Sequence, residues 1–122
     1  MATSPSRKLA LAAARGCASK KATDIVVLDV REITSIADYF VICSAGSERQ
    51  ARAIADDLRV SMRNEGIRQL GLEGASEGKW TLQDFGDVVV HVFHESQREF
   101  YDLEGLWADA KRVRWQPKAK KA

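Results

Sequence analysis

The sequence predicts an α/β fold of the α+β kind: a mixed sheet of about five strands with flanking helices. Two observations predict it, namely runs of β-branched and aromatic residues at strand length and segments with apolar residues at helical spacing. They alternate in the order α-β-β-α-β-β-β-α, which favours helices packed against one sheet. A chain of 122 residues, 45% hydrophobic and 30% charged, suits a single domain. We expect that domain at residues 1–110, followed by a basic C-terminal tail at 111–122.

The first helix is predicted over residues 5–19. Ser4 suits the N-cap, because its hydroxyl can accept from a free backbone N–H, and Pro5 suits the first helical position. An organellar transit peptide is the alternative interpretation, since residues 1–21 are rich in alanine and carry five basic residues and no acid.

Two buried strands are predicted next, at residues 25–30 and 39–43, both dominated by β-branched and aromatic side chains. A second helix begins after Ser47, which forms a capping box with Gln50, and ends at residues 64–66. Its buried face is predicted from apolar residues at helical spacing: Ala51, Ile54, Ala55, Leu58 and Met62.

The C-terminal half is predicted to contain three strands, at residues 67–72, 79–84 and 88–93. A two-residue turn at Phe85-Gly86 joins the last two strands into a hairpin. The last helix starts at a capping box formed by Ser96 and Glu99. Its buried stripe is predicted to contain Phe100, Leu103, Trp107 and Ala110.

Charge is distributed unevenly along the chain. Residues 111–122 carry six basic residues and no acid, and residues 1–21 are also free of acids. The middle of the chain, residues 22–110, therefore holds eight basic residues and all 17 acids. An acidic body favours basic partners and disfavours bare nucleic acid. The basic ends are suited to contact a phosphate backbone, although solvated tails are the simpler interpretation.

Nothing in the sequence indicates a membrane, a metal or a cofactor as partner. No apolar run approaches the length needed to cross a bilayer. Cys17 and Cys43 lie outside any Cys/His cluster of the zinc-binding type. Two isolated thiols fit a reducing compartment, and we expect a cytoplasmic protein.

Gly46-Ser47, at a strand-to-helix turn, is the first candidate for chemistry. Helix N-termini bind phosphates through free N–H groups, and a glycine-serine turn of this kind opens the nucleotidyltransferase fold. That reaction also needs two carboxylates that share a divalent metal. The next acids, Asp56 and Asp57, are adjacent in a predicted helix and point about 100° apart. A capped helix is therefore the favoured interpretation, and a degenerate nucleotide-binding enzyme is the alternative.

His91 is the second candidate, in mid-strand among valines. The predicted turn pairs Trp80 with His91 and Asp84 with Asp87, so an imidazole shares a face with two carboxylates. Such a histidine is able to act as a general base. However, no nucleophile and no glycine-rich oxyanion loop is placed beside it. We therefore predict no catalytic residue, and interpret His91 as part of the sheet or of a contact surface.

A docking surface is the stronger hypothesis for this face. Interface hot spots combine aromatic anchors with surrounding polar groups, and carboxylates suit a partner rich in Arg and Lys. The competing interpretation is that Trp80 and Leu82 are core residues beneath a helix, and periodicity alone leaves both open. The candidate contact residues are Trp80, Leu82, Asp84, Asp87 and His91, with Asp38, Tyr101 and Glu104 beside them.

Several of these motifs occur together in one known family. The chain closely resembles the ribosomal silencing factor family, also called Iojap-like proteins, in five segments: 21–30 (KATDIVVLDV), 37–44 (ADYFVICS), 78–93 (GKWTLQDFGDVVVHVF), 98–101 (REFY) and 103–107 (LEGLW). The resemblance covers roughly residues 5–110, nearly the whole predicted domain. The basic tail after Arg112 lies outside it.

The resemblance implies a function that the motifs alone do not. Members bind the large ribosomal subunit through ribosomal protein fourteen, at the surface that the small subunit must cover, and so repress translation. Their fold is akin to that of nucleotidyltransferases without the catalytic acids, they are not enzymes, and they tend to form homodimers off the ribosome. We expect the same partners here. The remaining alternative is an RNA-binding ribosome biogenesis factor that contacts ribosomal RNA through its basic ends.

Overall fold

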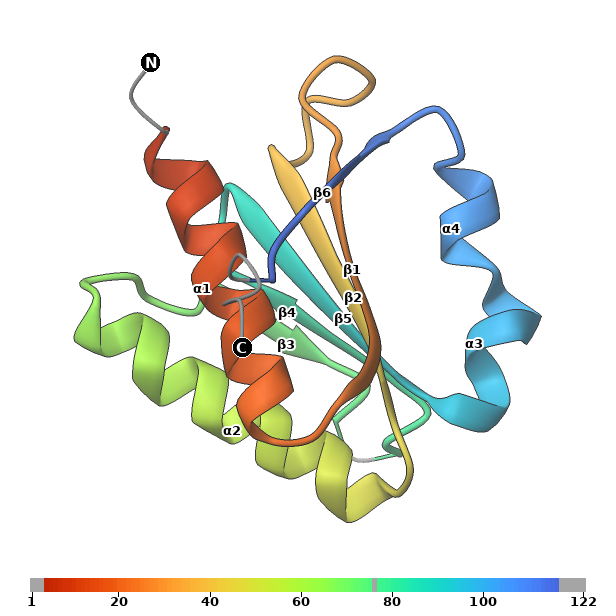
Figure 1. Ribbon diagram of the computed structural model, residues 1–122. Coiled ribbons are helices and arrows are strands. Elements are labelled where there is room, and N and C mark those ends of the chain that lie inside the picture. Colours follow the sequence, from red (N-terminus) through yellow and green to blue (C-terminus); the bar gives the residue numbers. More distant parts are fainter. Residues whose placement is uncertain (1–3, 76, 117–122) are drawn as a thin grey trace, which may run out of the picture.

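The computed structural model describes residues 4–75 and 77–116. They form a mixed α+β fold with one six-stranded sheet in the order β3-β4-β5-β2-β1-β6 (Figure 1). The central strands β2 and β5 run parallel, and the other neighbouring pairs are antiparallel. The elements are α1 (Pro5–Ser19), β1 (Thr23–Asp29), β2 (Tyr39–Ala45), α2 (Glu48–Asn64), β3 (Gly71–Glu73), β4 (Trp80–Asp84), β5 (Val88–His94), α3 (Glu95–Tyr101), α4 (Leu103–Leu106) and β6 (Lys111–Val113).

The helices lie on both faces of the sheet. Figure 1 shows α1 and α2 against one face and α3 and α4 on the other side. Val41 and Cys43 of β2 pack into the core beneath α1 and α2. Phe40 and Ile42, which alternate with them, pack into a second cluster that includes Leu103 of α4. Every residue of β2 is buried, as expected for a central strand covered on both sides.

The two long helices begin where the sequence predicts. The Ser4 Oγ accepts from the Arg7 backbone N–H at 3.2 Å, and the Ser47 Oγ accepts from the Gln50 N–H at 3.0 Å. Each of these bonds satisfies a backbone donor that the first helical turn leaves free. The predicted buried face of α2 is also confirmed in full.

The β4–β5 hairpin turns one residue later than predicted. The Phe85 N–H donates to the Val88 carbonyl at 2.9 Å, so Gly86 and Asp87 form the turn instead of Phe85 and Gly86. Gly86 has a φ of +90°, which glycine adopts without steric cost. Its N–H donates to the Asp84 Oδ1 at 2.8 Å, and this local side-chain bond places the turn.

The pairing of the two strands therefore moves by two residues. Trp80 lies opposite Phe93 and not His91, and the predicted pair of Asp84 and Asp87 is likewise wrong. A shift of two residues leaves the alternation of faces unchanged. The residues predicted to share a face still do so, except that Asp87 lies in the turn.

The last helix differs from the prediction in length and in its buried side. It is interrupted at Asp102, which adopts a left-handed φ of +43° and caps the short helix α4. The N-cap is His94, whose Nδ1 accepts from the backbone N–H of Ser96, so the predicted capping box is wrong. Leu103 is buried as predicted, whereas Phe100 is 78% exposed and is not a core residue.

Residues that the sequence analysis assigns to a basic tail add a sixth strand. β6 pairs antiparallel with β1, with Val113 opposite Val27. Beyond it, the Trp115 Nε1–H donates to the Ile25 carbonyl at 3.0 Å. The sheet thus has six strands where about five were predicted. The strand predicted at 67–72 is shorter, Gly71–Glu73, and the rest of the predicted tail, 117–122, lies outside the described residues.

Candidate functional site

A cluster of rings fills the sheet face beneath α3. The Trp80 ring stacks on Phe93 with centroids 5.0 Å apart, and the Tyr101 ring of α3 lies 4.7 Å from Trp80. Phe40 meets His91 edge-on at 5.1 Å. Contacts of this kind contribute about 0.5–1.5 kcal/mol each beyond area burial, so the aromatic cluster holds α3 against the sheet.

His91 is the polar member of the aromatic cluster. Its side chain is 4% exposed, and its Nδ1 accepts from the Trp80 Nε1–H at 3.2 Å. Burial lowers the pKa of His91 to about 4, because the apolar surroundings disfavour the imidazolium form. The ring is therefore neutral at pH 7, with its proton on Nε2, since Nδ1 accepts a hydrogen bond. This geometry suits a residue that orients Trp80 rather than a general base.

Tyr101 connects the aromatic cluster to the surface. It is 40% exposed, and its ring lies 5.2 Å from that of Phe100, which is far more exposed. Leu106, on α4, is 74% exposed. Exposed apolar groups gathered on neighbouring elements are typical of contact surfaces. The docking face consists of Trp80, Leu82, Phe100, Tyr101 and Leu106.

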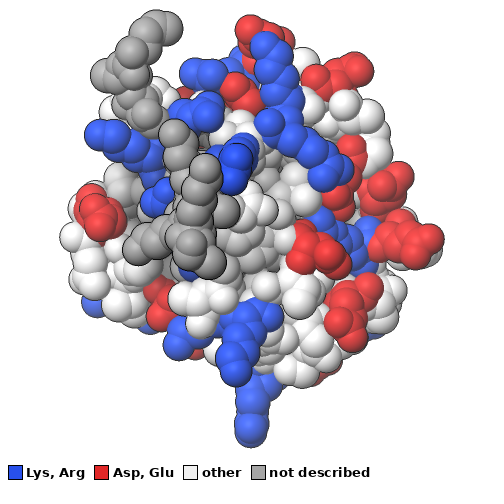
Figure 2. Space-filling view, in the orientation of Figure 1, with Lys and Arg blue, Asp and Glu red and all other residues white. Residues whose placement is uncertain are grey.

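Acidic side chains lie on and beside the same two helices. Residues 95–109 contain five acids and one base, and Figure 2 shows acids gathered over the α3 and α4 side of the molecule. Four of these acids are exposed: Glu95, Glu99, Asp102 and Asp109. The apolar docking face thus lies within a negatively charged region, which attracts a basic partner.

Three of the predicted contact residues, Asp38, Asp84 and Asp87, lie elsewhere in the fold. Asp84 ends β4, four residues from Trp80, which corresponds to roughly 13 Å along a strand. Asp38 precedes β2 and its N–H donates to the Asp87 carbonyl at 2.7 Å. These three acids therefore gather where β2 and β5 begin, whereas α3 follows the end of β5. The structure brings Trp80, Leu82, His91 and Tyr101 together and places these acids apart from them.

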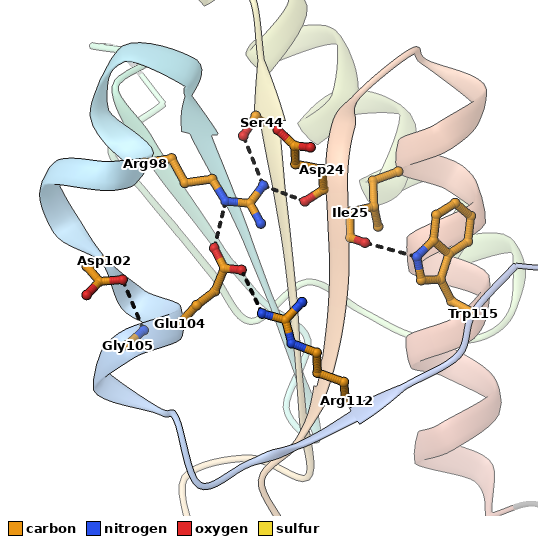
Figure 3. Close-up of polar contacts among 9 residues, drawn as sticks. All are labelled: Asp24, Ile25, Ser44, Arg98, Asp102, Glu104, Gly105, Arg112 and Trp115. Atoms are coloured by element: carbon orange, nitrogen blue, oxygen red, sulfur yellow. Dashed lines mark hydrogen bonds and ion pairs between the residues drawn. The ribbon is translucent and has the colours of Figure 1, made fainter.

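Glu104 is held inside a polar cluster between the helices and the sheet (Figure 3). The Arg98 Nε donates to the Glu104 Oε1 at 2.9 Å, and Arg98 also donates to the Ser44 Oγ and to the Asp24 carbonyl. Arg112 of β6 approaches the other Glu104 oxygen at 3.4 Å. The cluster ties α3 and α4 to β1, β2 and β6. Glu104 thus has internal partners, and its contact with another protein stays a prediction.

The glycine-serine turn is occupied by the chain's own side chains. The Gln50 Oε1 accepts from the Gly46 N–H at 2.7 Å, so this donor is already satisfied. Asp57 points toward Lys20, at 3.8 Å, and forms an ion pair with it. In the residues that the structure describes, no group of three or more His, Cys, Asp or Glu is placed to hold a metal ion. None of the helices in that part of the chain is long and apolar enough to cross a membrane.

Two exposed members of the docking face, Phe100 and Leu106, are not predicted from the sequence. A continuous helical period places Phe100 in the core, but the interruption at Asp102 changes which residues face the sheet. A signal for the interruption is present in the chain. Asp tolerates left-handed backbone, and the Asp102 carboxylate accepts from the backbone N–H of Gly105, three residues later.

The sequence matches a known family model over nearly its full length. The model described as "ribosomal silencing factor during starvation" covers residues 3–122. Ribosomal silencing factor RsfS of Bacillus subtilis is 47% identical over 98 residues, which span 80% of this chain and 83% of that protein. The chloroplastic protein Iojap of Zea mays is 40% identical over 104 residues, spanning 83% of this chain and 44% of that longer protein.

Solved structures agree with this assignment. A crystal structure of a Chromobacterium violaceum protein aligns with a TM-score of 0.81 at 34% identity, covering 93% of this chain and 94% of the other. A crystal structure from Bacillus halodurans aligns with a TM-score of 0.73 at 41% identity, covering 88% of this chain and 94% of the other. In sequence and in fold, the chain belongs to the ribosomal silencing factor family.

Proposed function

We propose that this protein binds the large ribosomal subunit through ribosomal protein fourteen and thereby prevents the small subunit from joining. Its family membership supports a role in silencing ribosomes. The observation that carries the more specific proposal is the docking face, because its exposed apolar side chains lie beside exposed acids on α3 and at the two ends of α4. Ribosomal proteins are basic, so such a surface is complementary to them in charge.

The physical roles within the docking face are distinct. Phe100, Tyr101 and Leu106 supply apolar area that a partner removes from water. The neighbouring acids, such as Glu99, attract the basic partner and fix its orientation rather than adding much affinity. The aromatic cluster below keeps α3 in place, so little order is lost on binding.

Repression by this route needs no catalytic residue. A stable interface removes about 800 Å² from each partner, roughly a tenth of the 7611 Å² that this protein exposes. A bound domain of this size occupies space that a second subunit needs in order to approach. Silencing is then an equilibrium effect, set by the protein's concentration and its affinity for the subunit.

The test uses Phe100→Ala and Tyr101→Ala, measured by co-sedimentation with isolated large subunits. Each truncation is expected to weaken binding by on the order of 1–3 kcal/mol, because each removes an aromatic anchor. These positions are preferable to Trp80, whose loss leaves the buried His91 Nδ1 without its donor, and to Asp84, whose carboxylate holds the turn at Gly86. Light scattering on the same variants tests the homodimer that the resemblance implies.

The matched control is Val60→Ala, an apolar truncation on the exposed side of α2, across the sheet from the docking face. It is expected to bind as the wild type does. If folded Phe100→Ala and Tyr101→Ala proteins also bind undiminished, the docking face is misplaced.

A further inference from the structure

Three arginines surround a small pocket at the C-terminal end of α2, away from the docking face. Arg59, Arg63, Arg68 and Gln69 line this pocket, which has a volume of about 190 Å³. A water molecule occupies roughly 30 Å³, so the pocket has room for a larger polar group. These four residues form the arginine pocket, and no carboxylate lines it.

The backbone holds the two ends of the arginine pocket together. The Ile67 N–H donates to the Met62 carbonyl at 2.8 Å, and the Leu70 N–H donates to the Asp84 carbonyl at 2.7 Å. These bonds fasten the segment between α2 and β3, so Arg68 stays beside the last turns of α2. The arrangement is thus part of the fold and does not depend on loose side chains alone.

The polar groups of the pocket are hydrogen-bond donors. A guanidinium group has five N–H donors and no acceptor. One lone pair of the Gln69 Oε1 is already used, because it accepts from the buried Gln83 Nε2 at 2.9 Å, and Gln83 also donates to the Ala55 carbonyl. The Gln69 amide therefore offers a ligand two N–H donors and one remaining lone pair. A ligand for these side chains must supply several acceptors and negative charge.

The positive charge of the pocket is not neutralised within the protein. Among the described residues, none of the three arginines forms an ion pair. Arg59 and Arg63 are one turn apart on α2, a spacing at which like charges repel. The negative end of the helix dipole favours Arg63, which is in the last turn, but Arg59 lies farther back and Arg68 lies outside the helix. Helix stability alone therefore does not explain why three arginines gather at this pocket.

We infer that the arginine pocket binds phosphate groups of RNA. The planar guanidinium group of arginine often donates two parallel N–H bonds to two oxygens of one phosphate. The surroundings favour an extended polyanion over a small ligand, because all three arginines are exposed at the surface, where a chain of phosphates can contact them one after another. This inference rests on the proposed function, since the large subunit presents RNA as well as protein. In this arrangement the docking face, with the acids beside it, contacts the protein, and the arginine pocket contacts the RNA.

The test measures binding of a short fluorescein-labelled RNA duplex by fluorescence anisotropy at KCl concentrations from about 50 to 200 mM. The variant is Arg59→Gln/Arg63→Gln/Arg68→Gln. It is expected to bind the duplex at least about tenfold more weakly at the lowest salt, and to lower the slope of log K against log[KCl] by about 3. All three side chains are exposed, so the variant is expected to fold, and thermal unfolding checks this.

The matched control, Arg15→Gln/Arg49→Gln/Arg114→Gln, removes three exposed arginines from other sites. It is expected to retain most of the affinity. Equal loss in both variants would assign RNA binding to net charge and overturn the inference, as would a pocket variant that binds like the wild type. Displacement of the duplex by low pyrophosphate concentrations would assign the pocket to a small phosphate ligand instead.

Co-sedimentation with large subunits separates this inference from the proposed function. If the wild type binds RNA through the pocket but does not sediment with large subunits, the proposed function fails and the phosphate site stands. If the protein sediments with large subunits but the pocket variant does so equally well and RNA binding is unaffected, the phosphate site fails and the proposed function stands.

Discussion

His91 is a titratable side chain held uncharged among aromatic rings. Its Nδ1 accepts from Trp80, and its ring packs against Phe40, so protonation must break a hydrogen bond and place charge in an apolar setting. In the unfolded chain the same imidazole has a pKa near 6.5, whereas in the fold its pKa is about 4. The unfolded state therefore binds more protons between these values, and stability falls on acidification.

The prediction concerns the free energy of unfolding at pH 7.5 and pH 5. The His91 contribution is fully present above the unfolded pKa of about 6.5 and is lost as the pH falls toward 4, amounting to roughly 2 kcal/mol by pH 5. Urea unfolding at the two pH values measures it. His91→Asn, which retains an acceptor but does not titrate, is the comparison. Equal pH dependence of the two proteins would show that His91 is not the group responsible.

Individual residues account for much of what the sequence predicts incorrectly. The turn is displaced because the Asp84 carboxylate bonds to the Gly86 N–H, a choice between neighbouring turns that composition does not decide. Phe100 is exposed because Asp102 changes to left-handed backbone just beyond it. Each difference arises from one short polar side chain, and apolar periodicity carries no information about such bonds.

At the level of elements, whether a helix or strand can be predicted from the sequence depends on how close in the sequence its stabilising contacts lie. The helices α1 and α2 are predictable because their caps and buried faces lie within their own residues. β6 is different, since it is three residues long, two of them basic, and its partner Val27 stands far away in the sequence from Val113. Only the folded sheet reveals that β1 has a free edge for it.

The prediction at this scale is that Trp115 fastens β6 to the domain. Trp115→Ala removes the hydrogen bond to the Ile25 carbonyl and part of the packing on the core, and is expected to cost about 1–3 kcal/mol of unfolding free energy. Hydrogen exchange is expected to accelerate at β1 and to change little at the central strand β5. Urea unfolding and exchange followed by NMR measure the two effects.

Trp115→Phe is the matched control, because it keeps an aromatic ring and removes only the N–H donor. It is expected to lose less stability than Trp115→Ala. Unchanged stability and unchanged exchange in the alanine variant would mean that β6 is held without this side chain.

On the scale of the whole molecule, the two sides of the sheet differ in charge. The side with α3 and α4 is acidic (Figure 2), whereas on the other side α1 carries only basic charges and α2 carries four basic residues and three acids. The sequence predicts an acidic body and basic ends, but it does not predict this separation. Because β2 and β5 are parallel, α2 and α3 leave the sheet at the same end, and Figure 1 shows them on opposite faces.

Together with the proposed function, this separation predicts an effect on the rate of association with large subunits. Glu99→Lys/Asp109→Lys reverses two exposed charges beside the docking face and is expected to slow association about tenfold at low salt, with less effect at high salt. Stopped-flow mixing measures the rate. The control, Asp56→Lys/Glu65→Lys, makes the same charge change on and after α2 and is expected not to slow association. Slowing by both variants would point to net charge.

The candidate site is predictable from the sequence only in part. Trp80, Leu82, His91 and Tyr101 do come together, because alternation on strands and a helix after β5 place them on one side. Asp38, Asp84 and Asp87 do not join them, since strand direction separates the two ends of a sheet. Glu104 is close to the docking helices but is bound to Arg98, a partner that only the packed structure identifies.

The position of β6 also has a consequence for the newborn chain. β1 is among the first elements to leave the ribosome during synthesis, and β6, which covers its outer edge, is the last strand in residues 4–116 as the structure describes them. Until then β1 offers a row of unpaired backbone groups, the kind of template on which nascent chains pair with one another. A product that stops before Lys111 keeps that edge open. For this domain, the synthesis of β6 and the protection of the fold from self-association coincide.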